Sequence, residues 1–456
     1  MPSRLAATAA FVLAFGGCGR ARAPDVLLVV LDTVRADHLS AYGYRLPTSP
    51  HLDALARTAD RYADARASAP WTLPSHASLF TGLAPFEHGA ESRRDAATGA
   101  LVDATPLREE LVTLAEAFAD AGYETRGVVA NPVYLGARSG LAQGFESWDV
   151  LPLGANDWRA VAHRAFERLR DRDPARPLFL FVNLMDAHRP YNVSSPQRMW
   201  LPAPDPSDPT ALLDQLVDAV MLRGEPDGTL AQRVVTQYDT GIANADRGLG
   251  ALLARFGEGR GGLEQALVVV TSDHGEYLGE HGLVEHSKDV YEPALRVPLV
   301  LKRPGQTEGR EIGGFVSLTD VARLVAEALP APLGLRIAQS FPAPQPAIPV
   351  AELRYTRPKD LFAPYGKRFD RIRTAFYADG WKLIRSSDGA HELYDLEADP
   401  AESANRIADD SPRAERMRAE LERQIGTREF RGPWPAAPAP TAEEHEALRA
   451  LGYVEP

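Results

Sequence analysis

The sequence contains a single cysteine, Cys18, among 456 residues. No disulfide can therefore form within the chain, so the fold does not rest on a disulfide framework. Basic side chains are in the minority as well: 50 lysine and arginine residues stand against 62 aspartate and glutamate residues, for a net charge of −12. This balance offers no basic stripe for a nucleic-acid backbone, which excludes nucleic acid as the expected partner.

Residues 1–23 have the pattern of an export signal. Arg4 precedes a short apolar stretch, Leu5 to Phe15, and two glycines come directly before Cys18. This order is typical of a secretory signal, and the apolar stretch is too short to span a bilayer. The cysteine after the small residues resembles a bacterial lipoprotein signal, which predicts that Cys18 is lipidated. We expect an exported periplasmic or outer-membrane lipoprotein of a bacterium that meets the membrane only through this anchor; a plainly cleaved signal and a retained anchor are the alternatives.

The chain as a whole has an ordinary globular composition, with 45% hydrophobic and 25% charged residues. Its length exceeds what one hydrophobic core usually supports, so we expect one large domain and a smaller one. Residues 24–330 alternate between buried-strand runs and helical patterns, which predicts an α/β fold with a large, mostly parallel sheet flanked by helices. The expected strands are residues 25–31, 61–67, 125–129, 178–184 and 266–270, and the expected helices are 50–57, 109–121, 158–170 and 229–256.

A proline-rich stretch, residues 331–349, is expected to connect the two domains. In residues 350–456, short strand-like runs are separated by Asp-Gly pairs at 379–380 and 388–389, which are typical of β-hairpin turns. We therefore expect a smaller C-terminal α+β domain with an antiparallel sheet.

The stretch T-L-P-S-H at 72–76 has the pattern of a helix start. Proline suits the first turn, and serine can accept hydrogen bonds from free backbone N–H groups. Thr72 would then lie at the positive end of a helix, where oriented N–H donors favour a phosphate or sulfate ester. The stretch alone leaves open that it is only a capped turn.

Two apolar runs of buried-strand length end in acidic residues. Residues 25–31 lead into Asp32, and residues 266–270 are followed closely by Asp273 and His274. In open α/β sheets, ligands bind beyond the carboxyl ends of the strands. We therefore expect these three side chains to meet at one site, although they are far apart in the sequence.

Together, these motifs resemble the sulfatase family within the alkaline-phosphatase superfamily, in the family's order. They are L-D-T-V-R-A-D-H at 31–38, T-L-P-S-H-A-S-L-F-T-G at 72–82, N-L-M-D-A-H-R-P-Y at 183–191, T-S-D-H-G-E at 271–276 with G-E-H-G at 279–282, and Y-E-P-A-L-R-V-P-L at 291–299. The resemblance runs from about Pro24 to the C-terminus. It implies an alkaline-phosphatase-like sandwich that hydrolyses sulfuric or phosphoric esters.

The resemblance also implies one divalent metal ion. Asp32, Asp273 and His274 would bind it, and the hydroxyl of Thr72 would be the fourth ligand. Two carboxylates and one imidazole suit Ca²⁺, Mn²⁺ or Zn²⁺. Such an ion lowers the pKa of a bound hydroxyl, which would make Thr72 the nucleophile.

Further positions match residues that handle the ester in the family. His188 is expected to donate a proton to the departing alcohol, and His286 is expected to contact the anionic oxygens, so both count as catalytic. Lys288 is the alternative to His286. His76, which replaces the arginine of typical sulfatases, and Asn131 are expected to bind substrate as well.

The nucleophile departs from the sulfatase pattern. Typical sulfatases read Cys-x-Pro-Ser-Arg, with the cysteine or serine converted into formylglycine; threonine cannot be converted in this way. Thr33 also stands where many sulfatases have a second metal-binding aspartate. Thr72 resembles the nucleophile of phosphoethanolamine and lipoteichoic-acid transferases, while Asp273-His274 is similar to the motif of phosphonate monoester hydrolases.

We therefore expect a metal-dependent hydrolase, a threonine-nucleophile variant of the family that acts on sulfate, phosphate or phosphonate esters of small molecules, glycans or lipids. Residues 192–228, rich in proline and aspartate, are expected to cross the active face and select the substrate. Phosphoryl transfer to an alcohol acceptor and non-catalytic binding of anionic glycans are the alternatives. Transferases of lipids usually carry several membrane helices, and none is visible here, which favours hydrolysis.

Overall fold

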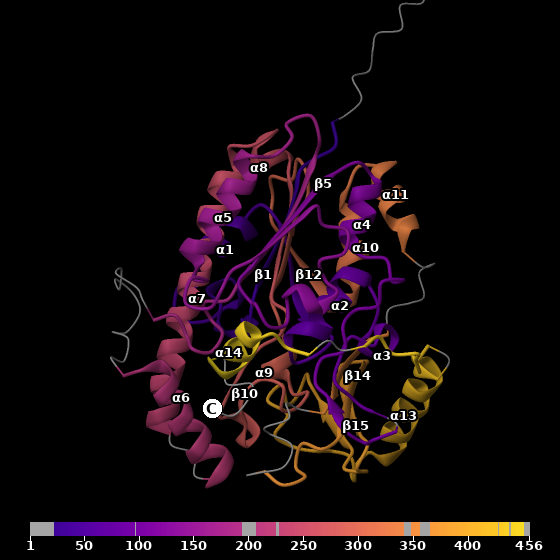
Figure 1. Ribbon diagram of the computed structural model, residues 1–456. Helices are drawn as coiled ribbons and strands as arrows, with labels where there is room; N and C mark the ends of the chain where they lie inside the picture. Colours follow the sequence, from indigo (N-terminus) through magenta and orange to yellow (C-terminus); the bar gives the residue numbers. More distant parts are fainter. Residues whose placement is uncertain are drawn as a thin grey trace, which may run out of the picture.

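The computed structural model describes residues 22–193, 207–341, 348–355 and 365–450, apart from residues 96, 225–227, 427, 437 and 438. An eight-stranded sheet forms its centre (Figure 1), and only β11 runs antiparallel to its neighbours. The predicted mostly parallel sheet is therefore confirmed. In spatial order the strands are β12 (Arg310–Ser317), β2 (Asp60–Arg66), β11 (Leu299–Lys302), β8 (Leu267–Thr271), β1 (Val26–Leu31), β7 (Leu178–Leu184), β5 (Glu124–Val129) and β6 (Ser147–Val150).

Helices cover both faces of this sheet (Figure 1). Every residue of the central strands β1, β7 and β8 is buried, as their continuous apolar runs require in a parallel sheet. One layer contains α1 (Pro50–Ala56), α5 (Trp158–Arg170), α7 (Gly228–Gly257) and α8 (Gly262–Gln265). The other contains α2 (Thr72–Thr81), α4 (Leu114–Asp120), α10 (Val321–Ala328) and α11 (Leu333–Ser340).

A second, antiparallel sheet lies in the C-terminal part, as predicted, with α13 (Ser411–Ile425) packed against it. Its strands are β13 (Val350–Arg354), β14 (Ile372–Ala378), β15 (Trp381–Ser386) and β16 (Glu392–Asp395). The chain then returns to the first domain through α14 (Ala442–Ala450), whose Ala447 and Leu448 join the main hydrophobic core. The shorter elements are α3 (Pro85–His88), β3 (Arg93–Arg94), β4 (Leu101–Val102), α6 (Pro209–Val217), β9 (Tyr277–Leu278), β10 (Val284–Glu285) and α9 (Glu292–Leu295).

Two boundaries differ from the sequence-based expectation. The helix expected over residues 109–121 begins only at Leu114, because Thr113 caps it: the Thr113 hydroxyl accepts from Glu116 N at 3.2 Å, and Thr113 N donates to the Glu116 carboxylate at 2.8 Å. The expected connection, residues 331–349, contains α11, which packs against α10 and α4. Part of this stretch therefore belongs to the helical layer, and residues 342–347 lie outside the described residues.

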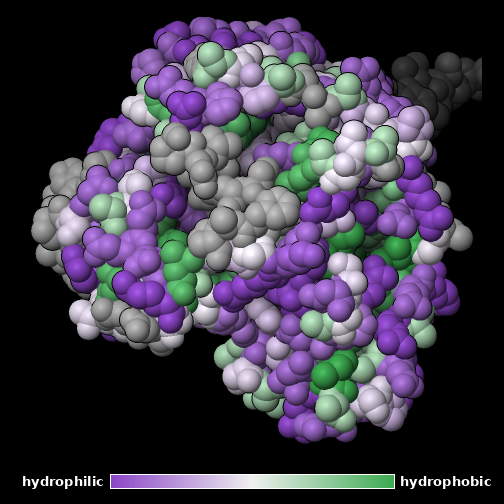
Figure 2. All heavy atoms as spheres, turned by 60° about the horizontal axis from the view of Figure 1, so that its bottom comes forward, coloured by the Kyte–Doolittle hydropathy of each residue, from purple (hydrophilic) through white to green (hydrophobic). Residues whose placement is uncertain are grey.

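The surface below the main sheet is turned forward in Figure 2, and it is mostly hydrophilic with small separate hydrophobic patches. Within residues 192–228, the described part includes α6, which packs against α7. Among the described residues, no helix combines the length and apolarity that a membrane crossing needs.

Helix α7 passes very close to the loop that follows β7. A Cβ atom added to Gly241 would lie 2.4 Å from the Asp186 carbonyl oxygen and 3.0 Å from the Ala187 Cα. Both distances are too short for a side chain, so glycine allows the helix to approach this loop. His188 lies on the same loop, and the packing of α7 therefore helps to position it.

We expect Gly241→Ala to destabilise the protein by about 1–3 kcal/mol through overpacking, although alanine favours helices by about 1 kcal/mol over glycine. Thermal unfolding measures the effect. Gly228→Ala is the matched control, because no atom lies within 4 Å of a Cβ at this position at the start of α7. A Gly241→Ala variant as stable as the wild type would contradict the close approach.

Candidate active site

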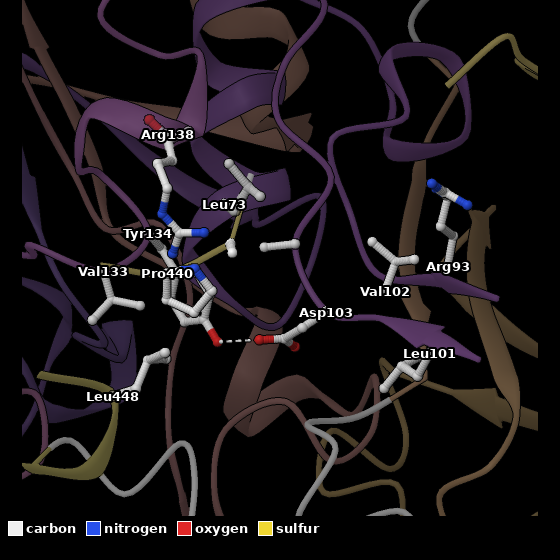
Figure 3. Close-up of a pocket in the computed structure, with 13 residues that line it drawn as sticks. Leu73, Arg93, Leu101, Val102, Asp103, Val133, Tyr134, Arg138, Pro440 and Leu448 are labelled. Carbon is white, nitrogen blue, oxygen red and sulfur yellow. Dashed lines mark hydrogen bonds between the residues drawn. The ribbon is translucent and has the colours of Figure 1, made fainter. Parts of the chain in front are cut away.

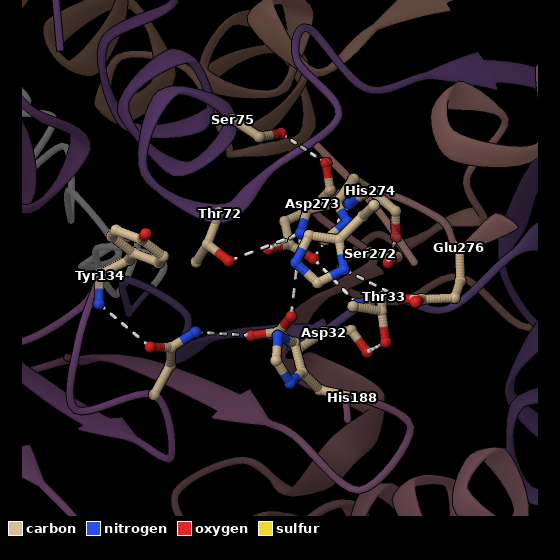
Figure 4. A network of polar contacts seen from close by, with 12 residues as sticks. Asp32, Thr33, Thr72, Ser75, Tyr134, His188, Ser272, Asp273, His274 and Glu276 are labelled. Carbon is tan, nitrogen blue, oxygen red and sulfur yellow. Dashed lines mark hydrogen bonds and ion pairs between the residues drawn. The ribbon is translucent and has the colours of Figure 1, made fainter. Parts of the chain in front are cut away.

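Thr72 is the first residue of α2, and its side chain lies at the carboxyl end of the main sheet. The residue is only 1% exposed, and its Oγ1 lies 3.5 Å from Nε2 of His274 (Figure 4). The expected helix start therefore exists, with the N–H groups of the first turn at the Thr72 end. Ser75 acts differently from the expectation: its hydroxyl donates to the Asp273 carbonyl oxygen at 2.5 Å and so fixes α2 to the loop after β8.

Asp32 and Asp273 follow β1 and β8, and both are fully buried. One oxygen of each carboxyl group is occupied. Asp32 Oδ2 accepts from the Asn183 and Asn131 side chains at 3.2 and 3.4 Å, and Asp273 Oδ1 accepts from the backbone N–H groups of Thr33 and His274 at 3.2 and 3.0 Å. The other oxygens, Asp32 Oδ1 and Asp273 Oδ2, accept no hydrogen bond within the described part of the chain.

His274 presents its Nε2 atom to these two oxygens. Its Nδ1 lies 2.9 Å from the Gly275 carbonyl oxygen, so Nδ1 donates there and Nε2 carries the lone pair. Nε2 lies 3.4 Å from Asp273 Oδ2 and 4.0 Å from Asp32 Oδ1. The ligand atoms of the three residues all lie within 4.8 Å of one another.

These atoms fit a divalent cation. Two buried carboxyl oxygens without hydrogen bonds, one imidazole nitrogen and the Thr72 hydroxyl form a mixed hard-oxygen and nitrogen donor set. Burial, and then the neighbouring Asp273, raise the pKa of Asp32 to about 7, and burial raises the pKa of Asp273 to about 7. Burial lowers the pKa of His274, which keeps its ring neutral. A cation would compensate the charge that burial disfavours.

Thr33 holds the two aspartate loops together. It has a left-handed backbone conformation, with φ of 62°, which is costly for a β-branched residue. In this conformation its N–H reaches Asp273 Oδ1, and its hydroxyl lies 2.8 Å from the Ala187 carbonyl oxygen and 2.7 Å from that of Asp32. Thr33 therefore ties the ends of β1, β7 and β8 to one another.

Three histidine rings gather beside Thr72. The ring of His286 lies 4.6 Å from that of His274 and 5.0 Å from that of His188, centroid to centroid. His286 Nδ1 lies 3.0 Å from Glu276 Oε2, and His188 Nδ1 lies 2.6 Å from the Arg189 carbonyl oxygen. In both rings Nδ1 thus has a fixed partner, which orients the ring and leaves Nε2 at its opposite side.

The structure gives other surroundings than expected to three residues assigned to substrate binding. Both polar atoms of the Asn131 side chain make contacts inside the protein, with Asp32 and with the backbone after Asn131. The His76 ring is fully buried, its Nδ1 lies 2.9 Å from the Thr72 carbonyl oxygen, and burial lowers its pKa to about 3. Lys288 is buried too, with Nζ 3.5 Å from Glu285. Asn131 and His76 thus contact two residues of the site, Asp32 and the Thr72 backbone, from inside the protein.

Sequence reasoning gave no role to Asn183 and Glu276. Asn183 donates to Asp32, and Glu276 contacts His286. A polar residue in an otherwise apolar buried strand was the available signal for Asn183. Glu276 stands in the T-S-D-H-G-E motif, two residues after His274.

Comparisons with known proteins agree with this geometry. A family model described as Sulfatase matches residues 24–331. The arylsulfatase of Clostridium perfringens is 22% identical over 365 residues, covering 65% of this chain and 73% of the relative. The ulvan-active sulfatase of Formosa agariphila is 24% identical over 446 residues, covering 88% and 80%. The solved phosphonate monoester hydrolase of Agrobacterium radiobacter shares the fold, with a TM-score of 0.65, 21% identity and coverage of 89% and 96%.

Metal affinity at this site is expected to depend on pH. Binding needs ionised Asp32 and Asp273 and a neutral His274. Since both carboxyl groups have a pKa of about 7, protons must leave them when a cation binds near neutral pH. The affinity for Ca²⁺, Mn²⁺ or Zn²⁺ should therefore fall between about pH 8 and pH 6, by about tenfold per unit for each proton displaced.

Calorimetry in two buffers of different ionisation enthalpy measures both the affinity and the protons released. Asp273→Asn should lose metal binding. Asp246→Asn is the matched control, because burial also raises the pKa of Asp246 to about 7, while its carboxylate accepts from the backbone N–H groups of His51 and Leu52. An affinity that stays constant over this pH range would contradict the assignment.

Proposed function

Because the chain belongs to the sulfatase family of ester hydrolases, we propose that it hydrolyses anionic esters with Thr72 as the nucleophile and one divalent metal ion as cofactor. One observation carries this proposal. The Thr72 hydroxyl lies at the N-terminus of α2, 3.5 Å from Nε2 of His274, beside the cluster that His274 forms with Asp32 and Asp273. A hydroxyl with such neighbours is positioned to attack an ester held at the helix end.

Each group at the site has a separate role in the proposed reaction. A bound divalent cation would lower the pKa of the Thr72 hydroxyl and neutralise one oxygen of the ester. The free N–H groups at the start of α2 stabilise the charge on the other oxygens. His286, oriented by Glu276, contacts these oxygens, and His188 donates a proton to the departing alcohol.

Threonine changes how the reaction is completed. A hydrated formylglycine carries a second hydroxyl on the same carbon, so it can collapse to the aldehyde and release its ester group. Thr72 has no such hydroxyl. Attack by Thr72 forms a bond from its Oγ1 to phosphorus or sulfur while the bond to the alcohol breaks. Water then attacks the same phosphorus or sulfur atom, and the bond from this atom to Oγ1 breaks. One proton of the water restores the Thr72 hydroxyl, and the remaining hydroxyl group leaves with the acid.

We therefore expect phosphate or phosphonate esters to be hydrolysed faster than matched sulfate esters. Release depends on the second attack, and we expect water to open the phosphorus intermediate on Thr72 faster than the sulfate intermediate. In metal-reconstituted protein, Thr72→Ala should lower turnover of 4-nitrophenyl phosphate by at least about 10³-fold, as for other lost nucleophiles. Thr72→Ser, which keeps the hydroxyl, is the matched control and should retain part of the activity. Mass spectrometry of the wild-type protein, quenched in acid during turnover, should detect phosphate on Thr72.

Turnover that survives Thr72→Ala would refute the nucleophile. Sulfate turnover that exceeds phosphate turnover and still needs Thr72 would refute the preference for phosphoryl esters while leaving the nucleophile in place. Added glycerol distinguishes hydrolysis from transfer, since a transferase would form glycerol phosphate instead of inorganic phosphate.

The proposal includes export and attachment through Cys18, which lies outside the described residues. The apolar stretch before this cysteine supports it. In a bacterial host, wild-type protein should incorporate labelled palmitate and stay with the membrane fraction, and Cys18→Ser should lose the label. An unlabelled soluble wild-type protein would indicate a plainly cleaved signal, and a Cys18→Ser protein that stays with the membrane would indicate a retained anchor.

A further inference from the structure

A cavity of about 440 Å³ lies between the start of α2, the β3–β4 hairpin and the C-terminal helix α14 (Figure 3). Sites for small molecules typically measure roughly 300–1,000 Å³, so this volume suits a small ligand. The proposed function, as stated, makes no use of this cavity.

The cavity adjoins the reaction site through two residues. Leu73, which lines it, directly follows Thr72. Tyr134 also lines it, and the ring of Tyr134 packs edge to face on Trp71 at 5.3 Å. The backbone N–H of Tyr134 donates at 3.1 Å to Asn131, whose amide donates to Asp32 (Figure 4). One hydrogen-bonded residue thus separates the cavity wall from a proposed metal ligand.

The walls combine apolar side chains with two arginines and one aspartate, Asp103. Leu73, Val102, Val133 and Leu448 provide apolar surface. Arg138 is paired with Glu444 of α14, with Nε 2.9 Å from the carboxylate. The remaining arginine, Arg93, is compensated more weakly.

For Arg93, the nearest carboxylate among the described residues is that of Asp95, at 3.8 Å. The Nε atom of Arg93 is buried and has no hydrogen-bond partner in the described part of the chain. Its guanidinium also lies over the ring of Trp434, at 5.6 Å from the centroid, a contact that supplies no negative charge. Asp103 also lines the cavity, and its carboxylate accepts a hydrogen bond from the Tyr134 hydroxyl at 3.4 Å (Figure 3). The cavity therefore offers apolar surface, one carboxylate that is held by Tyr134, and one cationic group, Arg93, whose charge is only weakly compensated.

Helix α14 makes one wall of this cavity. Leu448 is 6% exposed and reaches the same space as Leu73, and Glu444 fixes the helix to Arg138. The C-terminal tail, more than 350 residues away from Thr72 in the sequence, therefore belongs to the surroundings of the nucleophile.

We infer that this cavity binds the alcohol portion of the ester, and that α14 makes the enzyme selective for alcohols that are apolar and carry an acidic group. The inference rests on the proposed function. The apolar walls bury the body of the alcohol, and Arg93 pairs with its acidic group.

Three phosphate esters test the inference with the metal-reconstituted full chain: phenyl phosphate, 2-naphthyl phosphate and 6-carboxy-2-naphthyl phosphate. We expect kcat/KM to rise in this order. Leu448→Trp fills the cavity and should lower kcat/KM for both naphthyl esters by about tenfold or more, with phenyl phosphate nearly unchanged. Val102→Trp fills the cavity from the opposite wall and should lower kcat/KM for the same two esters. This variant keeps the test valid if Leu448→Trp displaces α14.

Arg93→Met should abolish the advantage of the carboxylated ester through KM, and leave the neutral naphthyl ester unchanged. Leu335→Trp and Arg170→Met are matched controls, because these side chains are 62% and 68% exposed on α11 and α5. Neither control should change the order of the three esters.

Equal kcat/KM for the three esters in the wild type, or equal losses for all three in the tryptophan variants, would overturn the inference. A failure of the proposed function remains distinguishable. In Thr72→Ala, which has no turnover to lose, 6-carboxy-2-naphthol should still bind, as followed by its fluorescence, and Arg93→Met should weaken this binding. Absent binding of the naphthol would refute the cavity assignment whatever the chemistry at Thr72.

Discussion

Asp32 and Asp273 are buried together at the ends of β1 and β8, and each keeps one oxygen without a hydrogen bond among the described residues. Burial disfavours the ionised form of both carboxyl groups and so raises both pKa values, and the neighbouring Asp273 raises the pKa of Asp32 further. A fold keeps such an arrangement only where its surroundings hold the groups in place. Much of the neighbouring structure has this effect, including the left-handed Thr33 and the Ser75 hydroxyl on the Asp273 carbonyl.

The main sheet could be predicted because its central strands are buried on both faces. Such strands read as continuous apolar runs, and residues 178–184 match β7 without an error at either end. The edge strand β12 was missed, since all of Arg310–Ser317 except its last residue is exposed or half-buried and the segment contains two glycines. Helix α11 was missed because prolines flank it closely. It belongs to the domain through its buried Ile337 and its packing against the preceding α10 and against α4, which is distant in the sequence.

In the candidate site, too, the sequence predicted what depends on the strands and missed what depends on packing. Residues that end a buried strand, such as Asp32 and Asp273, could be placed from the sequence, because strand order and direction bring their ends together. The roles of Asn131, His76 and Glu276 could not, because the direction of a side chain depends on packing. His76 lies one helical turn after Thr72, and its ring turns inward, where it packs edge to face on Phe181.

Helix α14 lines the cavity that begins at Leu73, directly after the proposed nucleophile Thr72. In the proposed mechanism, the ester formed on Thr72 is opened by a second attack, so the alcohol has to leave and make room for water beside the same residue. An alcohol bound too tightly would delay that step, and one bound loosely would give no selectivity. Both requirements, release of the alcohol and selectivity for it, can be met when the alcohol is bound by a wall that belongs neither to α2 nor to the proposed metal ligands. Helix α14 provides such a wall, since its Leu448 lines the cavity and its Glu444 pairs with Arg138, which lies outside α2 and outside the cluster of Asp32, Asp273 and His274.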